Sequence, residues 1–81
     1  MDRQKVLNIM LRHLANNVQG IDPKAVDPVH SMGDYGATSL DMLEVVAAAG
    51  EELDVRIPRT KLSRCRSLNE VVDLFLVCSA Q

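Results

Sequence analysis

The residue with the clearest chemical potential is a serine, Ser39, at the start of a predicted helix. It follows the turn-forming segment Asp34-Tyr35-Gly36-Ala37-Thr38, and an amphipathic pattern begins immediately after it. A hydroxyl group at this point is expected to be exposed and to lie at the positive end of a helix dipole. A phosphate ester formed on Ser39 would therefore be stabilised, and the sequence predicts a serine that is modified.

Cysteine and histidine give weaker chemical signals. Cys65 and Cys78 could form a redox pair or supply a nucleophile, but both have apolar neighbours, and free cysteine commonly behaves as a small core residue. His13 and His30 have no partners at metal-ligand spacing, so we expect solvated surface histidines and no metal site. Two cysteines do not form a disulfide framework, which favours a reducing cytoplasm.

Length and composition limit the classes of protein that this chain can represent. Its 81 residues predict one domain, 1–81. Apolar residues make up 47% and aromatic residues only 2%, so aliphatic side chains and alanine fill the core, which suits packed helices. The net charge of −2 is too small for a nucleic-acid binder as a whole. The charged start and the short apolar runs predict neither a signal peptide nor a membrane span.

The spacing of apolar residues predicts four helices. The first covers residues 3–18, the second 39–53, and a short third helix of one or two turns lies within 59–65. A capping box at Ser67 and Glu70 starts the fourth helix, which ends near residue 79. The predicted fold is therefore all-α.

Residues 19–38 form a long connection between the first two helices, punctuated by prolines and glycines and without predicted regular structure. A loop of this length in a small domain needs an anchor. We expect it to be fixed to the core by scattered apolar side chains, namely Ile21, Val26, Val29, Met32 and Tyr35.

The second helix carries two different faces. Thr38 and Asp41 form a capping-box-like pair at its start, and its core stripe consists of Met42, Val45, Val46, Ala49 and Leu53. Gly50 costs this helix about 1 kcal/mol relative to alanine, which close packing would explain.

Apolar residues also lie beside the acidic arc on the other face of this helix. The arc consists of Asp41, Glu44, Glu51 and Glu52, and the apolar residues are Leu40, Leu43 and Ala47. Apolar side chains bordered by carboxylates favour a docking surface for another protein. The alternative is that the long loop covers them.

Three segments resemble the acyl and peptidyl carrier proteins, a likeness that extends over residues 3–78. Ser31-Met32-Gly33-Asp34-Tyr35-Gly36-Ala37-Thr38-Ser39-Leu40 is similar to the family's loop and attachment motif. Glu51-Glu52-Leu53-Asp54-Val55-Arg56-Ile57-Pro58 is similar to its exit from the second helix. Ser67-Leu68-Asn69-Glu70-Val71-Val72-Asp73-Leu74 is similar to the start of its last helix. The glycine–serine match alone is weak, but all three at these separations form a specific pattern.

The resemblance implies a four-helix carrier bundle with a long first loop, a short third helix and 4′-phosphopantetheine on Ser39. A phosphopantetheinyl transferase would attach this arm from coenzyme A with Mg²⁺, and the arm would hold acyl groups as thioesters. Such a protein is not an enzyme, is expected to be monomeric when free, and needs no base near Ser39. It would present its acyl group to partners such as an acyltransferase or a ketosynthase.

The chain departs from the commonest carriers in three places. Thr38 stands where fatty-acid carriers usually have aspartate, Ala49 is smaller than the usual residue facing the acyl chain, and residues 55–66 contain five basic residues and no acid. These departures favour polyketide or mixed polyketide–peptide assembly, with Arg59 and Lys61 added to the docking surface. The segment 55–59 also resembles donor carriers of β-branching cassettes, which serve an HMG-CoA-synthase-like enzyme.

Two other functions are compatible with the pattern. The chain could be an unmodified helical protein–protein interaction module in which Ser39 only borders a helix. The basic run 56–66 could instead bind phosphate, in coenzyme A or in a nucleic acid held by a helix-turn-helix-like pair. The acidic face beside this run disfavours nucleic acid.

Overall fold

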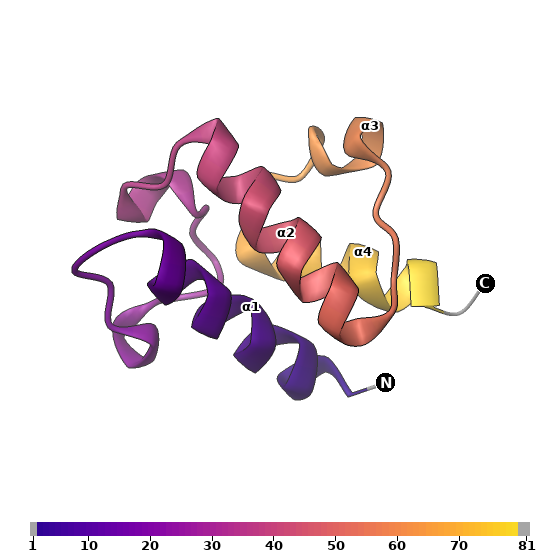
Figure 1. Cartoon of the computed structure of the whole chain (residues 1–81), viewed down its shortest axis with the longest axis horizontal. Coiled ribbons are helices and arrows are strands. Elements are labelled where there is room, and N and C mark those ends of the chain that lie inside the picture. Colours follow the sequence, from indigo (N-terminus) through magenta and orange to yellow (C-terminus); the bar gives the residue numbers. More distant parts are fainter. Residues whose placement is uncertain (1, 80–81) are drawn as a thin grey trace.

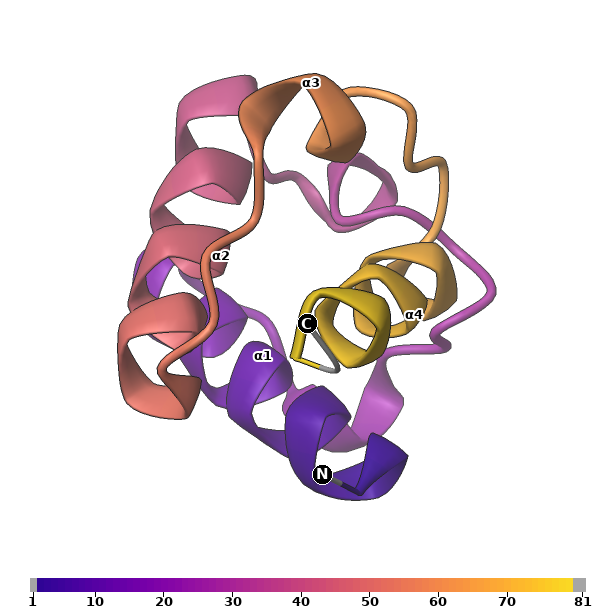
Figure 2. The ribbon, with the colours of Figure 1, turned by 90° about the vertical axis from the view of Figure 1, so that its right-hand side faces the viewer.

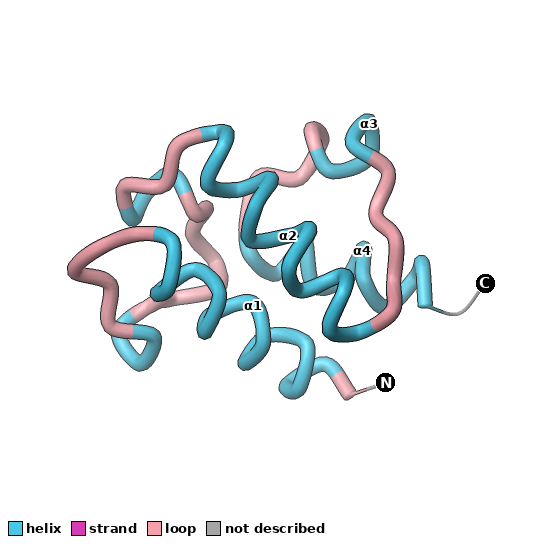
Figure 3. Tube along the Cα trace, viewed as in Figure 1, coloured by secondary structure: helices cyan, strands magenta, loops and turns pink. Residues whose placement is uncertain are grey.

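The computed structural model describes residues 2–79, and this part of the chain is helical without a strand. Its α-helices are α1 (Arg3–Asn17), α2 (Ser39–Leu53), α3 (Arg59–Leu62) and α4 (Leu68–Ser79), and two short 3₁₀ turns, η1 (Pro23–Ala25) and η2 (Gly33–Tyr35), lie between α1 and α2 (Figures 1 and 3). The predicted all-α fold with a long first loop and a short third helix is confirmed.

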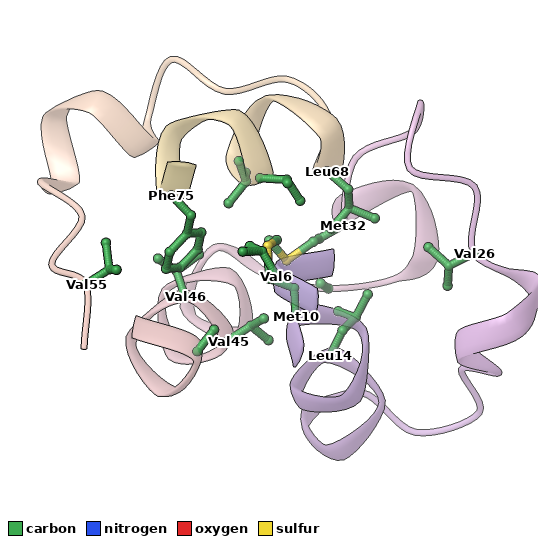
Figure 4. Close-up of a cluster of buried hydrophobic side chains, with 14 residues drawn as sticks. Val6, Met10, Leu14, Val26, Met32, Val45, Val46, Val55, Leu68 and Phe75 are labelled. Carbon is green, nitrogen blue, oxygen red and sulfur yellow. The ribbon is translucent and has the colours of Figure 1, made fainter. Parts of the chain in front are cut away.

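The three longer helices surround one core. Helix α1 packs against both α2 and α4, while α3 lies at the opposite edge, between α2 and α4 (Figure 2). The predicted stripes supply the core because residues three and four apart share a helix face. Its fully or nearly fully buried helical side chains are Val6, Met10, Leu14, Val45, Val46, Ala49, Leu68, Val71, Val72 and Phe75 (Figure 4).

The loop between α1 and α2 is more regular than predicted, because it forms the turns η1 and η2. Val26 and Met32 are buried and do anchor it to the core. The expectation for Val29 was wrong, since this side chain is 68% exposed. At this point the backbone forms the anchor instead: the N–H groups of Leu68 and Asn69 donate to the carbonyl oxygens of His30 and Pro28, both at 2.9 Å.

The C-terminal end of α2 explains the glycine inside the helix. Asp54 adopts the left-handed conformation with φ of 56°, and the N–H of Val55 returns to donate to the Gly50 carbonyl at 2.9 Å. A Cβ atom on residue 50 would lie only 2.6 Å from the carbonyl oxygen of Val55. Close backbone approach therefore requires glycine here.

Ion pairs join α1 to its two neighbours. Arg3 contacts Asp73 of α4, while Arg12 and His13 both contact Glu52 of α2, His13 through Nε2 at 3.0 Å. Hydrogen bonds from His13 and Arg12 lower the pKa of Glu52 below its usual value. The prediction of a solvated surface histidine was wrong for His13, whose side chain is only 20% exposed.

The structure also shows the surroundings of His30 and of the two cysteines. His30 is exposed and lies 3.7 Å from the Asp34 carboxylate. Cys65 and Cys78 are free, half-buried and packed against the core, as predicted. Within residues 2–79, no group of three His, Cys, Asp or Glu side chains is placed to hold a metal ion. Nor does any helix of this range have the length and apolar character needed to cross a bilayer.

Candidate functional site

Ser39 is exposed and is the first residue of α2. Gly36, with φ of 93°, turns the chain into the helix, and Thr38 is the N-cap. The predicted capping box is present: the Asp41 N–H donates to Thr38 Oγ1 at 3.1 Å, and the Thr38 N–H donates to the Asp41 carboxylate at 2.9 Å. These bonds fix the start of the helix without involving the side chain of Ser39, which is an exposed residue.

The same capping box leaves room for an anion at Ser39. It pairs the N–H groups of Thr38 and Asp41, whereas those of Ser39 and Leu40 have no partner within residues 2–79. Unpaired N–H groups at the start of a helix, together with the helix dipole, stabilise phosphate. The local geometry therefore fits a phosphodiester on the Ser39 oxygen.

Ser39 also lines a cavity of about 460 Å³ between α2, α3, α4 and the first loop, here called the Ser39 cavity. A volume of this size is within the range of small-molecule sites. Its apolar lining comes from Met32, Met42, Leu43, Leu62, Leu68 and Val71. An organic group attached to Ser39 could fold back into this space.

Backbone hydrogen bonds between the first loop and α4 fix the far wall of the cavity. The N-terminal N–H groups of α4 bind loop carbonyls at residues 28 and 30, which places Ser31 beside Ser67. The predicted capping box of α4 is formed, with the Glu70 N–H donating to Ser67 Oγ at 3.2 Å and the Ser67 N–H donating to the Glu70 carboxylate at 3.1 Å. The wall is thus held in place by hydrogen bonds within the protein.

Several residues of the cavity were not predicted as site residues. Leu62, Ser67 and Arg66 lie far from Ser39 in sequence, and only the return of the chain through α3 brings them close. The basic run of 55–66 was the one available signal, and it did not indicate which of its members would face Ser39. Cys65 also lines the cavity, where burial raises the pKa of its thiol and the charges of Glu70 and Asp73 add to the effect. A protonated thiol is a poor nucleophile.

Comparison with known proteins identifies the family. A family model described as a phosphopantetheine attachment site matches residues 11–75, most of the chain. The chain belongs to this family. Its members carry 4′-phosphopantetheine as a covalent arm, so this protein is an acyl carrier and not an enzyme.

Curated carriers match over most of their length. An acyl carrier protein of Acidothermus cellulolyticus is 38% identical over 64 residues, which cover 78% of this chain and 76% of the relative. One of Zymomonas mobilis is 31% identical over 70 residues, 85% and 83% of the two chains. A Bacillus subtilis protein named polyketide biosynthesis acyl-carrier-protein AcpK is 24% identical over 74 residues, 91% and 90% of the two chains. No solved structure matches the carrier significantly.

The predicted docking residues belong to α2 and α3. Leu40 is 64% exposed and Ala47 is exposed, so the first loop does not cover them. Leu43 is half-buried and lines both the Ser39 cavity and a second groove of about 700 Å³ between α2, α3 and the link joining them, here called the α2 groove. Glu44, Arg59 and Lys61 are exposed. Asp41 is half-buried because its carboxylate belongs to the capping box.

Proposed function

We propose that Ser39 carries the 4′-phosphopantetheine arm and that this acyl carrier serves polyketide or mixed polyketide–peptide assembly. The observation that supports this attachment site is the exposed residue Ser39 at the start of α2, beside N–H groups that have no partner within residues 2–79 and at an apolar cavity. When bound, the arm supplies a terminal thiol that holds an acyl group as a thioester.

The residues around Ser39 have separate tasks in this proposal. The N–H groups of Ser39 and Leu40 stabilise the phosphodiester, and the apolar wall of the Ser39 cavity shelters the acyl group from water. No base is required near Ser39, because a phosphopantetheinyl transferase activates the hydroxyl with Mg²⁺. Tethering then keeps the intermediate at a high effective concentration near successive enzymes.

Partner enzymes dock on the exposed side formed by α2 and α3. Leu40, Leu43 and Ala47 supply apolar contact, and Glu44 adds negative charge, while Arg59 and Lys61 supply positive charge at the neighbouring edge. Charges of both signs fix the orientation of a partner that carries the complementary pattern, and complementary charge speeds encounter at low salt. The partners include the transferase and an acyltransferase or ketosynthase.

Three features support the polyketide assignment. The relative named AcpK matches nearly the whole chain, Thr38 replaces the aspartate usual in fatty-acid carriers, and the basic side chains of 56–66 are exposed or line the site. The likeness of residues 55–59 to β-branching donor carriers adds a more specific proposal. In that pathway the carrier would bring an acetyl-type group to an HMG-CoA-synthase-like enzyme.

Loading with coenzyme A tests the attachment site. Incubation with Mg²⁺ and a broad-specificity transferase should increase the mass of the wild-type protein by one phosphopantetheine. Ser39→Ala should gain nothing, and the matched control Ser79→Ala, at an exposed serine ending α4, should load normally. A folded wild-type protein that gains no mass would instead support the unmodified interaction module.

Transfer assays test the pathway. Acetyl-loaded protein should react with an HMG-CoA-synthase-like enzyme of a β-branching cassette faster than it serves a fatty-acid ketosynthase. The double variant Arg59→Glu, Lys61→Glu should lower the first rate by about tenfold or more, since charge reversal places like charges at the interface. Equal rates with both enzymes, unaffected by the reversal, would contradict the assignment.

A further inference from the structure

The Ser39 cavity combines an apolar floor with a rim of positive charge. Arg59 and Arg66 both line it, and no acidic residue does so within residues 2–79. Neither guanidinium has a carboxylate within ion-pair distance in this range. In contrast, both arginines of α1 are paired with acids. The two cations beside the attachment point are thus available to an anion from outside the fold.

Hydroxyl groups add hydrogen-bond donors to the same rim. Ser31 Oγ accepts from the Asp34 N–H at 3.2 Å, and Ser67 Oγ accepts from the Glu70 N–H at 3.2 Å. Within the described range neither hydroxyl donates to a protein acceptor, so each O–H can donate to a ligand. The nearby Glu70 carboxylate accepts from the backbone N–H groups of Arg66 and Ser67 through Oε2, and within residues 2–79 it forms no ion pair with an arginine.

We propose that the Ser39 cavity binds an acyl group that bears a carboxylate, held by Arg66 with Arg59 and the hydroxyls of Ser31 and Ser67. Guanidinium groups bind carboxylates with paired, charge-assisted hydrogen bonds. The stems of long basic side chains lie along apolar surface while their heads meet the anion. A neutral aliphatic group would fill the floor and leave the two exposed guanidinium groups to water.

This inference rests on the proposed attachment of the arm to Ser39 and specifies the cargo. The phosphodiester of the arm is a second anion, but it is bonded directly to Ser39 and is common to every loaded form. A comparison between acyl groups therefore separates the two anions. Malonyl and acetoacetyl groups form a suitable pair, because they are nearly equal in size and differ in one carboxylate.

The experiment loads the wild-type protein from malonyl-, acetoacetyl- and acetyl-coenzyme A, confirms each product by mass, and measures thermal unfolding at low salt. The malonyl form should have a midpoint about 4 °C above the acetoacetyl form, the shift expected from one ion pair between exposed groups in a domain of this size. The protein already has a net charge of −2, so an added negative charge without a specific partner would not stabilise it.

Variants then assign the effect to the rim. Arg66→Gln should abolish the difference between the malonyl and acetoacetyl forms, and Arg66→Lys should retain part of it. The control Arg64→Gln makes the same charge change at an exposed residue outside the cavity and should retain all of it. In the malonyl form of the wild type, the Arg66 Nε–H resonance should shift relative to the acetoacetyl form.

Other results would overturn the inference. Equal midpoints for malonyl and acetoacetyl forms would show that the carboxylate has no partner. An Arg66→Gln effect of the same size in every loaded form would assign the arginine to the phosphodiester. If Arg64→Gln and Arg66→Gln decreased the difference between the malonyl and acetoacetyl midpoints equally, the difference would be an effect of net charge and not of the cavity. Absence of any mass gain would refute the proposed attachment, and this inference with it, whereas normal loading with equal midpoints refutes the cargo site alone.

Discussion

The side of α2 that faces α1 differs from the side that faces α3 in how its charges and apolar groups are used. Toward α1, the helix buries Val45 and Ala49 completely, and Glu52 pairs with two residues of α1. Toward α3, Leu43 borders two open spaces, and Arg59 has no acidic partner within residues 2–79. The first side holds the fold together, and the second leaves groups available for binding.

This division has a physical reason. Helix α1 is long enough to cover α2 and α4 with a continuous apolar stripe, whereas α3 has a single turn and cannot fill the space between them. Short helices contribute little stability of their own. A carrier that must receive different acyl groups and partners is therefore most open where its shortest helix lies. Substitutions on the two sides should have different consequences.

The largest stability effect is expected at Phe75, the largest fully buried side chain. Phe75→Ala should lower the free energy of unfolding, measured with urea, by about 3–5 kcal/mol because it leaves a cavity in the packed side. Val77→Ala is the control on the same helix, at a residue that is 55% exposed, and should change it by less than about 0.5 kcal/mol. A loss below about 1 kcal/mol for Phe75→Ala would mean that α4 does not anchor the core.

A smaller loss is expected at Gly50, where α2 meets its own exit. Gly50→Ala gains about 1 kcal/mol of helix propensity, but its Cβ would lie 2.6 Å from a backbone oxygen. Overpacking costs about 1–3 kcal/mol, and the upper end applies because a backbone atom cannot rotate away. We therefore expect a net loss of about 2 kcal/mol in urea unfolding.

Gly33→Ala is the matched control for Gly50. Its Cβ would meet only Ser31 Oγ at 3.6 Å, an ordinary contact, and the free energy of unfolding should stay within about 0.5 kcal/mol of the wild type. If Gly50→Ala proved as stable as the wild type, the account of the α2 exit would be wrong.

Substitutions on the side of α2 that faces α3 should have the opposite effect. They should change stability little and reduce function strongly. Leu43→Asp should change the free energy of unfolding by less than about 1 kcal/mol. It should lower kcat/KM of the transferase about tenfold, which corresponds to about 1.4 kcal/mol of lost binding. Val29→Asp adds the same charge at an exposed apolar residue away from α2 and should load like the wild type. Unfolding of Leu43→Asp would place Leu43 in the core.

The smallest change in stability is expected when the pH is lowered. Because His13 and Arg12 lower the folded-state pKa of Glu52 below its ordinary value of 4.5, this contact stabilises the fold fully above that pH and is lost as the pH falls through the lower folded value. Below pH 4.5, stability measured by urea unfolding should decline less steeply for Glu52→Gln than for the wild type.

The control for the acid effect is Glu44→Gln. Glu44 is exposed on α2 and has no ion-pair partner within residues 2–79. The stability of Glu44→Gln should therefore decline with falling pH as steeply as that of the wild type. If the stability of Glu52→Gln and of the wild type declined equally with falling pH, the α1–α2 ion pair would contribute nothing to the free energy of unfolding.

Periodicity and capping signals were sufficient to predict most of the fold. The stripe on α1 and the capping boxes at Thr38 and Ser67 depend on residues a few positions apart, where local geometry decides. The prediction for Val29 was wrong because the backbone, and not its side chain, anchors that part of the loop. The role of Gly50 depends on the path of the chain after the helix, which no local pattern specifies.

The candidate site was predictable only in part. Ser39 is recognisable because a turn, a cap and a helix meet at it in sequence. The wall opposite Ser39 is not, because Ser31 and Arg66 come together through hydrogen bonds between the first loop and α4. The partners of Glu52 were missed for the same reason, since they depend on how α1 lies against α2.

Amide NMR spectra of the protein before and after loading test most directly whether the arm lies on the side of α2 that faces α3. The account predicts shifts concentrated at Ser39, Leu43, Leu62 and Ser67, with α1 residues such as Val6 and Leu14 unchanged. Unchanged spectra in a folded sample, or shifts concentrated along α1, would contradict it.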